Sequence, residues 1–498
     1  MARDLLRCRT ILVIGIGLCT GLSACDRGGS LPSTDRSVIE PVRESQPADT
    51  AVTTAVAEPS DEIDSTQESR PPAMPSQQVF RPDDRRPYHD DALLKEAGIQ
   101  IYESTRLKLY TDIDAEVAQS LPPLIDQVYP VWQQELGPLS PDLAGTEFQM
   151  TGYLIRDLAL FRELGLVPEE LVPEHGRHLR NEFWMREQAY DYYRRHLLIH
   201  EATHCYMTFQ AGFQAPVWYL EGMAEYFAAH HLDQDHRASF GVMPTSPGAF
   251  AGFGRIPLIR EDVATNNARS ISSICAFQPR EFNTTQHYAW SWALCLFLDQ
   301  TPRYHKRFQA LSGLTQGTQF PQMFLELFRS DERDLTTEWT LFSFNLQYGY
   351  DMVRAAIDFR PGTLLTADQP ERLQRVAADR GWQSSEVRLE SGEKYEVVAT
   401  GQFVLGNQPK PWVSEPQGIT FRYFDKHPIG TLLGCIRTEE GAVGGANEPM
   451  LQVIPLGRGR EFEASATGTL YLRLNEAWNS LHDNQGHATV VIRRVERP

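Results

Sequence analysis

The sequence predicts an α+β domain followed by an all-β domain. Residues 98–188 alternate short strand-like runs with a helical segment, and residues 190–359 then keep mostly helical spacing. From residue 382 to 494, short alternating runs are separated by Gly, Pro and Asn, which is typical of a β-sandwich. We therefore expect an α+β domain at 81–375 and a β-sandwich at 380–498.

Composition excludes several classes of protein. The chain has 498 residues, of which 41% are hydrophobic, so it can bury real cores. Its 47 Lys and Arg against 65 Asp and Glu give a net charge of −18, which argues against a nucleic-acid partner. With only 14 His and 7 Cys, any metal site must be local.

The N-terminus has the pattern of an export signal. Three arginines precede an apolar run at residues 11–18, which is too short to span a bilayer comfortably. Leu-Ser-Ala-Cys25 follows, and it resembles the lipobox of bacterial lipoproteins. This resemblance implies removal of residues 1–24, lipidation of Cys25 and membrane contact through the lipid anchor only. The alternative is a plain signal peptide whose cysteine is accidental.

Residues 25–80 predict a disordered tether. The segment is rich in Ser, Thr, Pro, Asp, Glu and Ala and has almost no aromatic residues, so it cannot bury enough apolar surface to fold. As a flexible coil it would span roughly 40 Å.

Four cysteines remain in the part of the chain that is expected to fold: Cys205, Cys275, Cys295 and Cys435. An exported compartment permits disulfides, and four thiols allow three pairings, among which the spacings do not choose. Cys295 lies in an apolar run and is expected to be buried.

The first elements follow from periodicity. Residues 98–111 alternate apolar and polar side chains and predict one or two strands, and residues 146–155 predict another. Residues 115–136 have helical spacing and end at Gly137, a usual C-terminal signal. The segment EFWMREQ at 182–188 predicts a short strand.

The most informative stretch is His200-Glu201-Ala-Thr-His204, within a segment that lacks turn breakers. Residues four apart lie on one face of a helix, so His200 and His204 can present two imidazoles to one ion. Glu201 sits one residue along, where it can reach a bound water. This geometry predicts a zinc hydrolase, and the alternative is a surface helix with two solvated histidines.

A second helix, starting at Pro216, supplies carboxylates. Its apolar residues keep helical spacing, which places Glu221 and Glu225 together on another face. A catalytic zinc needs a third protein ligand, and Glu221 is the candidate. Glu225 is expected to accept a hydrogen bond from a ligating imidazole. The alternative is a solvated acidic face.

The segments HEATH and WYLEGMAEYF resemble the gluzincin metallopeptidases of the peptidase MA type, most specifically over residues 196–228. The resemblance implies a zincin-like catalytic domain with a small mixed sheet and a helical bundle. In that family the two histidines and the first Glu of the Glu-Gly pair bind Zn²⁺, which corresponds to His200, His204 and Glu221. The Glu of the first motif is the general base, here Glu201. The separation of His204 from Glu221 is slightly shorter than in the best-known members.

Peptide hydrolysis also needs a donor that stabilises the oxyanion. Gln286-His287-Tyr288 opens an apolar helix, and in similar proteins a helix that begins with Tyr follows the metal site. Tyr288 is therefore the first candidate and His287 the second, while a structural tyrosine is the alternative. The strand at 182–188 sits where zincins place an edge strand for extended substrate, and residues 238–285 are expected to wall the cleft.

The C-terminal region, over residues 392–401, 428–436 and 468–486, resembles bacterial galactophilic lectins and related sandwiches. Those lectins hold calcium with an acidic residue, a hydroxyl residue four positions later, two Asn further on and an earlier Tyr. The matching positions are Glu476, Ser480, Asp483 and Asn484. The Tyr position falls near Leu405, which is a departure.

The lectin resemblance implies a Ca²⁺ site and a carbohydrate ligand, because oxygen donors suit a hard cation. The alternative is a plain turn rich in Asn and Asp. Trp412 and Trp478 would either stack on a sugar ring or fill the sandwich.

The sequence thus predicts zinc-dependent hydrolysis of a peptide or protein at the bacterial cell envelope, in the periplasm or at the cell surface. A cell-wall amide is another substrate that it allows. The alternative, from a different class, is a carbohydrate-binding or envelope-interaction lipoprotein with an inactive zincin domain. The intact His-Glu-x-x-His and Glu221 favour the enzyme, because a decayed site would lose its base first.

Overall fold

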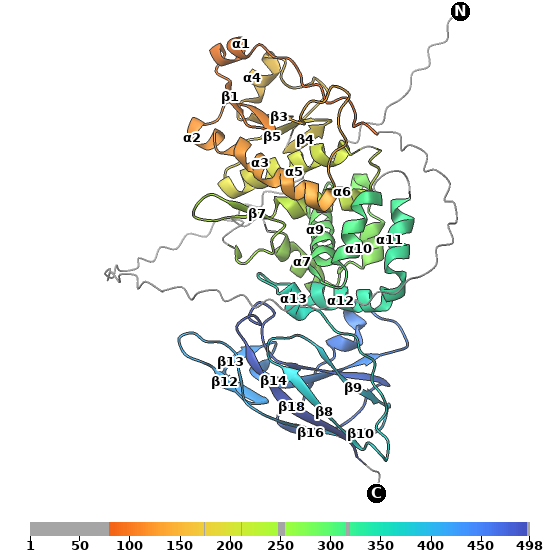
Figure 1. Ribbon diagram of the computed structural model, residues 1–498. Coiled ribbons are helices and arrows are strands. Elements are labelled where there is room, and N and C mark those ends of the chain that lie inside the picture. Colours follow the sequence, from red (N-terminus) through yellow and green to blue (C-terminus); the bar gives the residue numbers. More distant parts are fainter. Residues whose placement is uncertain (1–78, 174, 211, 248–253, 315–318, 496–498) are drawn as a thin grey trace, which may run out of the picture. The chain divides into compact units, whose positions relative to one another are not determined.

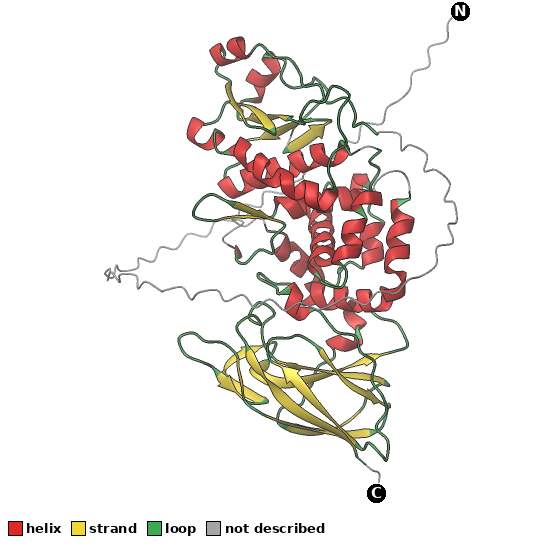
Figure 2. Ribbon diagram, viewed as in Figure 1, coloured by secondary structure: helices red, strands yellow, loops and turns green. Residues whose placement is uncertain are grey.

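The computed structural model describes residues 79–173, 175–210, 212–247, 254–314 and 319–495. The predicted signal, Cys25 and the predicted tether as far as residue 78 lie outside these ranges. Helices and mixed strands fill the first part of the described chain, and strands dominate after residue 370 (Figures 1 and 2). Within the described residues, we find no helix with the length and apolar character that a membrane crossing requires.

The first sheet has five strands in the order β1-β2-β3-β5-β4. Their bounds are β1 Gln100–Glu103, β2 Leu107–Thr111, β3 Met150–Ile155, β4 Gly176–Leu179 and β5 Glu182–Arg186. The inner pairs β2-β3 and β3-β5 are parallel, while β1 and β4 run antiparallel to their neighbours. The sheet is therefore mixed, as expected.

The expectation that residues 182–188 form the edge strand is wrong. β5 pairs with β3 on one side and with β4 on the other, so β4 is the edge. The physical reason is strand order, because residues 176–179 form a further strand that pairs with the outer side of β5. Phe183, Trp184 and Met185 are all buried, so β5 is also covered on both faces.

The helix predicted at 115–136 is interrupted. It forms α2 Ala115–Ala118 and α3 Leu121–Leu136, with a break before the prolines at positions 122 and 123. Proline fixes its own backbone angle and is tolerated in the first turn of a helix, so it starts α3 and does not continue α2. Two short helices, α1 Asp91–Glu96 and α4 Leu158–Glu163, are capped by the side chains of Asp90 and Asp157.

The helical stretch begins with α5 Asp191–Thr208, which packs against β4 and β5 of the sheet and against α6 Val217–Ala228. All twelve residues of α6 are buried, because α5 and α9 Thr285–Gln300 cover it. The other elements are β6 His230–Leu232, β7 Ala238–Phe240, α7 Arg255–Ala264, α8 Ile271–Cys275, α10 His305–Ala310, α11 Phe320–Phe328, α12 Glu332–Asn345 and α13 Met352–Ala355.

The C-terminal domain consists of antiparallel strands in two sheets. One sheet has the order β12-β11-β18-β10-β16, with β8 also on β18, and the other has the order β13-β14-β17-β9, with β15 on β14. The strands are β8 Glu371–Ala377, β9 Gln383–Leu389, β10 Lys394–Thr400, β11 Phe403–Val404, β12 Val413–Ser414, β13 Gln417–Phe424, β14 His427–Thr438, β15 Ile454–Pro455, β16 Gly459–Glu463, β17 Gly468–Leu474 and β18 Gln485–Arg494.

This domain begins earlier than the sequence predicts. β8 lies before residue 380, and only Val376 of its seven residues is buried, so it carries little of the alternation that reveals a strand. Trp382 and Trp478 belong to the same buried cluster as residues of α9 and α12. The sandwich thus packs against the helical part through shared buried residues.

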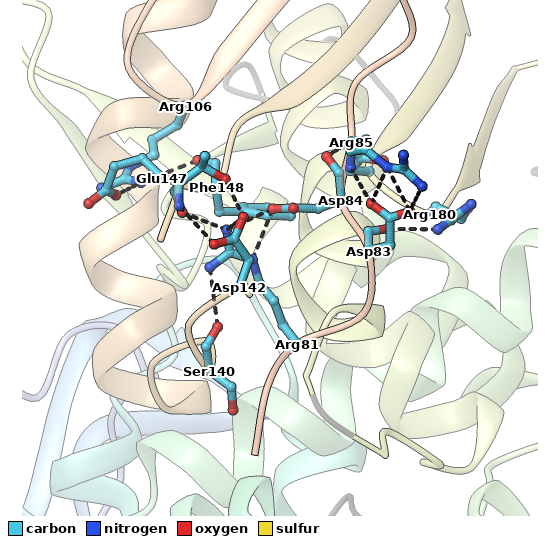
Figure 3. A network of polar contacts seen from close by, with 12 residues as sticks. Arg81, Asp83, Asp84, Arg85, Arg106, Ser140, Asp142, Glu147, Phe148 and Arg180 are labelled. Atoms are coloured by element: carbon cyan, nitrogen blue, oxygen red, sulfur yellow. Dashed lines mark hydrogen bonds and ion pairs between the residues drawn. The ribbon is translucent and has the colours of Figure 1, made fainter. Parts of the chain in front are cut away.

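The segment before α1 is held in place by Arg81 (Figure 3). Its guanidinium donates to Asp84 at 2.9 Å, to the Ser140 carbonyl at 3.2 Å and to the Thr146 carbonyl at 2.7 Å. Asp142 adds an ion pair at 3.6 Å. The start of the described chain is therefore tied to the loop that follows α3.

Candidate metal site

Three side chains from two helices form the candidate metal cluster, His200, His204 and Glu221. The histidines lie one turn apart on α5, and α6 brings Glu221 against them. Nε2 of His200 and Nε2 of His204 are 3.0 Å apart, and they lie 3.4 and 3.3 Å from Oε2 of Glu221. All three residues are at most 3% exposed.

The arrangement of these donor atoms suits the binding of a cation better than hydrogen bonding among themselves. Both carboxylate oxygens of Glu221 are buried without a hydrogen-bond partner. Ligand atoms that surround a tetrahedral zinc at about 2.0–2.1 Å lie roughly 3.3 Å apart, which matches the observed triangle. Buried polar atoms normally have partners, so this unsatisfied carboxylate indicates a site for a cation.

The electrostatics of the cluster also favour positive charge. Burial by itself lowers the pKa of His200, but Glu221 and Glu225 raise it to about 10. Burial raises the pKa of Glu221, yet His204 and His200 bring it down to about 2. The site thus keeps a carboxylate ionised in the interior and attracts a compensating positive charge.

Glu201 lies beside the cluster, under the edge strand. It is 3% exposed, and its Oε2 is 3.8 Å from Nδ1 of His178 on β4. Burial raises its pKa above the ordinary value, and His200 and His204 oppose that rise. Gly176 passes so close that a Cβ at that position would lie 2.2 Å from Oε1 of Glu201. A larger residue at position 176 would therefore displace the Glu201 side chain.

Glu225, one turn after Glu221, takes part in a second buried group. Its Oε1 lies 3.3 Å from Nδ1 of His200, and its Oε2 lies 3.2 Å from Nε2 of His196. Arg255 binds both oxygens, with Nη2 at 2.6 Å and Nε at 2.8 Å. Burial opposes the ionisation of Glu225, but Arg255 and His196 hold its pKa well below the ordinary value. Because Arg255 binds both of its oxygens, Glu225 is a poor metal ligand. Its approach to Nδ1 of His200 is close but is not a hydrogen bond.

Tyr288 and His287, the predicted oxyanion donors, differ in position. The ring of Tyr288 lies 6.3 Å from that of His200, centroid to centroid, but its hydroxyl donates to the Phe282 carbonyl at 3.3 Å and the residue is 0% exposed. His287 contacts Thr284 at 2.7 Å and Glu281 at 3.9 Å. The structure therefore brings Tyr288 near the cluster and places His287 among other partners.

The predicted calcium residues differ in their surroundings. Glu476 and Asn484 are buried, and Oε2 of Glu476 and Oδ1 of Asn484 have no hydrogen-bond partner. Asp483 faces Gly406, but the hydroxyl of Ser480 donates to Asn479 at 3.2 Å. Leu405, at the position of the Tyr in the lectins, packs in the sandwich core and offers no side-chain ligand.

The two tryptophans of the β domain have different surroundings. Trp478 is 2% exposed, and the guanidinium of Arg473 lies 3.8 Å from the centre of its ring. Trp412 is half-buried and touches the exposed Phe421 at a ring distance of 5.4 Å. Trp478 thus fills the interior, and of the two only Trp412 has a ring that a ligand can reach.

Sequence reasoning missed His178, His196 and Arg255. His178 stacks on His204, whereas His196 and Arg255 contact Glu225. The available signals were weak: a glycine two residues before His178, and the position of His196 one turn before His200. The segment 238–285 was expected only to wall the cleft, yet it supplies Arg255. The four cysteines Cys205, Cys275, Cys295 and Cys435 are free thiols, and Cys295 is buried as expected.

A cleft of about 940 Å³ lies elsewhere, around the segment that Arg81 anchors. Its walls include Arg81, Asp84, Lys108 and Asp142, and no residue of the candidate metal cluster lines it. Those four side chains are already engaged in ion pairs. These ion pairs hold together part of the cleft wall.

No family model and no curated protein sequence matches the chain. Among solved structures, the chain is similar to one described as "EclA N-terminal domain; PllA-like lectin", with 20% sequence identity over 25% of this chain and 96% of that chain, at a TM-score of 0.20. The β domain itself is established by the strands described above.

Proposed function

We propose that the protein is a zinc-dependent metallopeptidase of the gluzincin type. One observation carries the proposal: two histidine Nε2 atoms and an unpartnered carboxylate oxygen of Glu221 form a buried triangle with edges of 3.0, 3.3 and 3.4 Å. His200, His204 and Glu221 would hold the ion, and three protein ligands leave a position open for chemistry. The sequence spacing supports the same ligand set.

Charge balance supports a dication at this position. Glu201, Glu221 and Glu225 are three buried carboxylates, and Arg255 is the guanidinium that pairs with one of them. Histidines bind a metal in their neutral form, and with His200 and His204 neutral these groups sum to −2. Buried charge is tolerated only when it is compensated, and Zn²⁺ would supply the missing charge.

Glu201, Glu225 and Arg255 would each have a separate role in the reaction. When bound, zinc lowers the pKa of water and polarises a carbonyl group. A carboxylate oxygen of Glu201 accepts the proton of the attacking water and then delivers it to the leaving amine. Glu225 orients the His200 ring through Nδ1, and Arg255 fixes Glu225. The burial of all these groups excludes bulk water from the reaction.

The predicted export signal and Cys25 add a location to this proposal. A lipid-anchored enzyme on a tether would act on peptides or proteins at the bacterial cell envelope. The acidic chain would meet the membrane through its anchor only, with no nucleic-acid partner.

The decisive experiment uses the chain from Asp26 onward, which lacks only the signal and the lipidated cysteine. We expect one zinc per molecule by elemental analysis, cleavage of a mixed peptide library, and loss of cleavage on chelation with recovery on adding Zn²⁺. Glu201→Gln should keep the metal and lose cleavage by about 10³-fold or more. A wild-type protein that binds no zinc would refute the proposal, and so would a Glu201→Gln variant that is fully active.

A second candidate function concerns the β domain, as a calcium-dependent carbohydrate binder. The specific observation is that Oε2 of Glu476 and Oδ1 of Asn484 are buried oxygens without partners, which a hard cation would satisfy. Calcium should then raise the melting temperature of wild type but not of Glu476→Gln, and retention on a galactose matrix should require calcium. Equal responses of both proteins to calcium would show that the site is wrong. If this function alone were present, the zincin domain would be inactive.

A further inference from the structure

His178 occupies a position that the proposed mechanism has not used. It lies on the edge strand β4, and its ring stacks on that of His204 with centroids 4.5 Å apart and planes 27° apart. Its Nδ1 lies 3.8 Å from Oε2 of Glu201. One side chain therefore contacts a candidate ligand and the predicted base together.

The local backbone explains this placement. Side chains two apart on a strand share one face, so Gly176 and His178 both turn toward α5. Gly176 has no side chain, which lets β4 approach Glu201 closely, and His178 then reaches over His204. Leu179, the next residue, is 41% exposed.

Accessibility singles out His178 among the groups around the site. Its side chain is 17% exposed, whereas those of Glu201, His200, His204 and Glu221 are between 1% and 4% exposed. Arg255 and Tyr288, two other donors near the cluster, donate to Glu225 and to the Phe282 carbonyl. A substrate that approaches from the β4 side meets His178 first.

We propose that His178 is a catalytic residue that donates a hydrogen bond to the scissile carbonyl oxygen of an extended peptide, which lies along the free edge of β4. The inference rests on the proposed peptidase function and deepens it. An imidazole N–H needs no change of charge to donate, and its stacking on His204 fixes the plane of the ring. An edge strand has unpaired backbone groups, which pair readily with an extended chain.

Another role for His178 is that of a fourth metal ligand, which would close the site as in structural zinc centres. Among the described residues, the groups whose donor atoms converge within ligand distance are His200-His204-Glu221 and His196-His200-Glu225, and neither contains His178. The observed geometry thus favours contact with substrate over contact with metal.

The test compares wild type, His178→Ala and His178→Asn, with Leu179→Ala as the matched control on the same strand. Four quantities are measured: kcat and KM on a cleaved peptide, zinc affinity by competition with a coloured chelator, and affinity for a phosphonamidate dipeptide. The tetrahedral phosphoryl group of this dipeptide copies the hydrated amide. His178→Ala should lower kcat by about 10²–10³-fold and weaken phosphonamidate binding, with zinc affinity unchanged. His178→Asn should lose less kcat and less phosphonamidate affinity than His178→Ala. Leu179→Ala should behave as wild type.

Each contrary result has its own meaning. Unchanged kcat and phosphonamidate affinity in His178→Ala would overturn the assignment, and a large loss of zinc affinity would make His178 a ligand instead. A wild-type protein that binds zinc but not the phosphonamidate would also overturn it. A wild-type protein that binds no zinc would instead refute the proposed peptidase function.

Discussion

Arg255 and Glu225 form a bidentate ion pair inside the protein. Nε of Arg255 lies 2.8 Å from Oε2 of Glu225 and Nη2 lies 2.6 Å from Oε1, and Glu225 is 0% exposed. Because Oε1 also faces Nδ1 of His200 at 3.3 Å, the pair connects α7 to a candidate ligand. Arg255 therefore compensates the buried charge of Glu225 and fixes the orientation of its carboxylate beside His200.

Replacing Arg255 by Met should therefore weaken zinc binding by about 10–100-fold, because an unpaired Glu225 no longer orients His200. Arg255→Lys keeps the positive charge but cannot bind both carboxylate oxygens as a guanidinium does. Its zinc affinity should therefore lie between those of Arg255→Met and wild type. Zinc affinity is measured by competition with a chelator at fixed pH. Arg437→Met, which removes the ion pair with Asp334 far along the chain, is the control. Equal zinc affinity in Arg255→Met and wild type would contradict this role.

Gly176→Ala should separate catalysis from metal binding. The added methyl would lie 2.2 Å from Oε1 and 2.7 Å from Cδ of Glu201, so the carboxylate must move. A displacement of about 1 Å can cost about 10²-fold in rate, and we expect a loss of kcat of that order. Zinc affinity should change little, since the ligands are not touched. Gly313→Ala, where the methyl meets nothing within 4 Å, should leave kcat unchanged. Unchanged kcat in Gly176→Ala would place Glu201 outside the reaction.

The sequence was sufficient to identify the candidate ligands because their arrangement is local. Because His200 and His204 are four residues apart, they share one face of the helix that spans residues 191–208. Glu221 lies in the next helix along the chain. Two consecutive helices usually pack together, so their polar residues can be expected to meet. The mixed sheet and the β domain were also predicted, since strand periodicity and turn residues are local signals.

Other features depend on tertiary contacts that no local pattern carries. Arg255 binds Glu225, which lies 30 positions earlier in the sequence. His178 on β4 contacts Glu201 on α5. The edge of the sheet was misplaced because strand order, which decides that β4 lies outside β5, is not encoded in either strand's own alternation. A buried histidine or arginine in such a place is recognised only when its partner is seen.

Trp478 and Trp412 should differ sharply when each is replaced by Ala. Trp478 stacks on Tyr350 at 5.6 Å and underlies Arg473, so its loss leaves a cavity at the contact between the β domain and the helical part. We expect a loss of about 3–5 kcal/mol in the free energy of unfolding, measured by denaturant titration. Trp412→Ala should cost less stability, because Trp412 is only partly buried against the sandwich core, and it should weaken any carbohydrate retention. A destabilisation of similar size in both variants would show that Trp412 also belongs to a core.

The buried carboxyl of Glu338 is expected to make the stability of the protein depend on pH. It lies on α12, accepts hydrogen bonds from the Ile357 N–H at 2.7 Å and the Tyr304 hydroxyl at 2.5 Å, and is 5% exposed. Burial raises its pKa from 4.5 to about 7, although both hydrogen bonds oppose the rise. The folded protein therefore binds a proton that the unfolded chain releases above pH 4.5. The resulting stability is fully present below pH 4.5 and is lost as the pH rises through 7.

The gap between the two pKa values is about 2.5, which corresponds to about 3 kcal/mol at roughly 1.4 kcal/mol per pKa unit. Glu338→Gln has nearly the same shape but no titration, and its amide can donate to Tyr304 as a protonated carboxyl would. The free energies of unfolding of both proteins, measured between pH 4.5 and 8 with excess chelator, should therefore converge or cross as the pH changes. Wild type should lose about 3 kcal/mol relative to the Gln variant over that range. Parallel pH profiles would mean that Glu338 stays ionised in the folded protein, and that its two hydrogen bonds outweigh its burial.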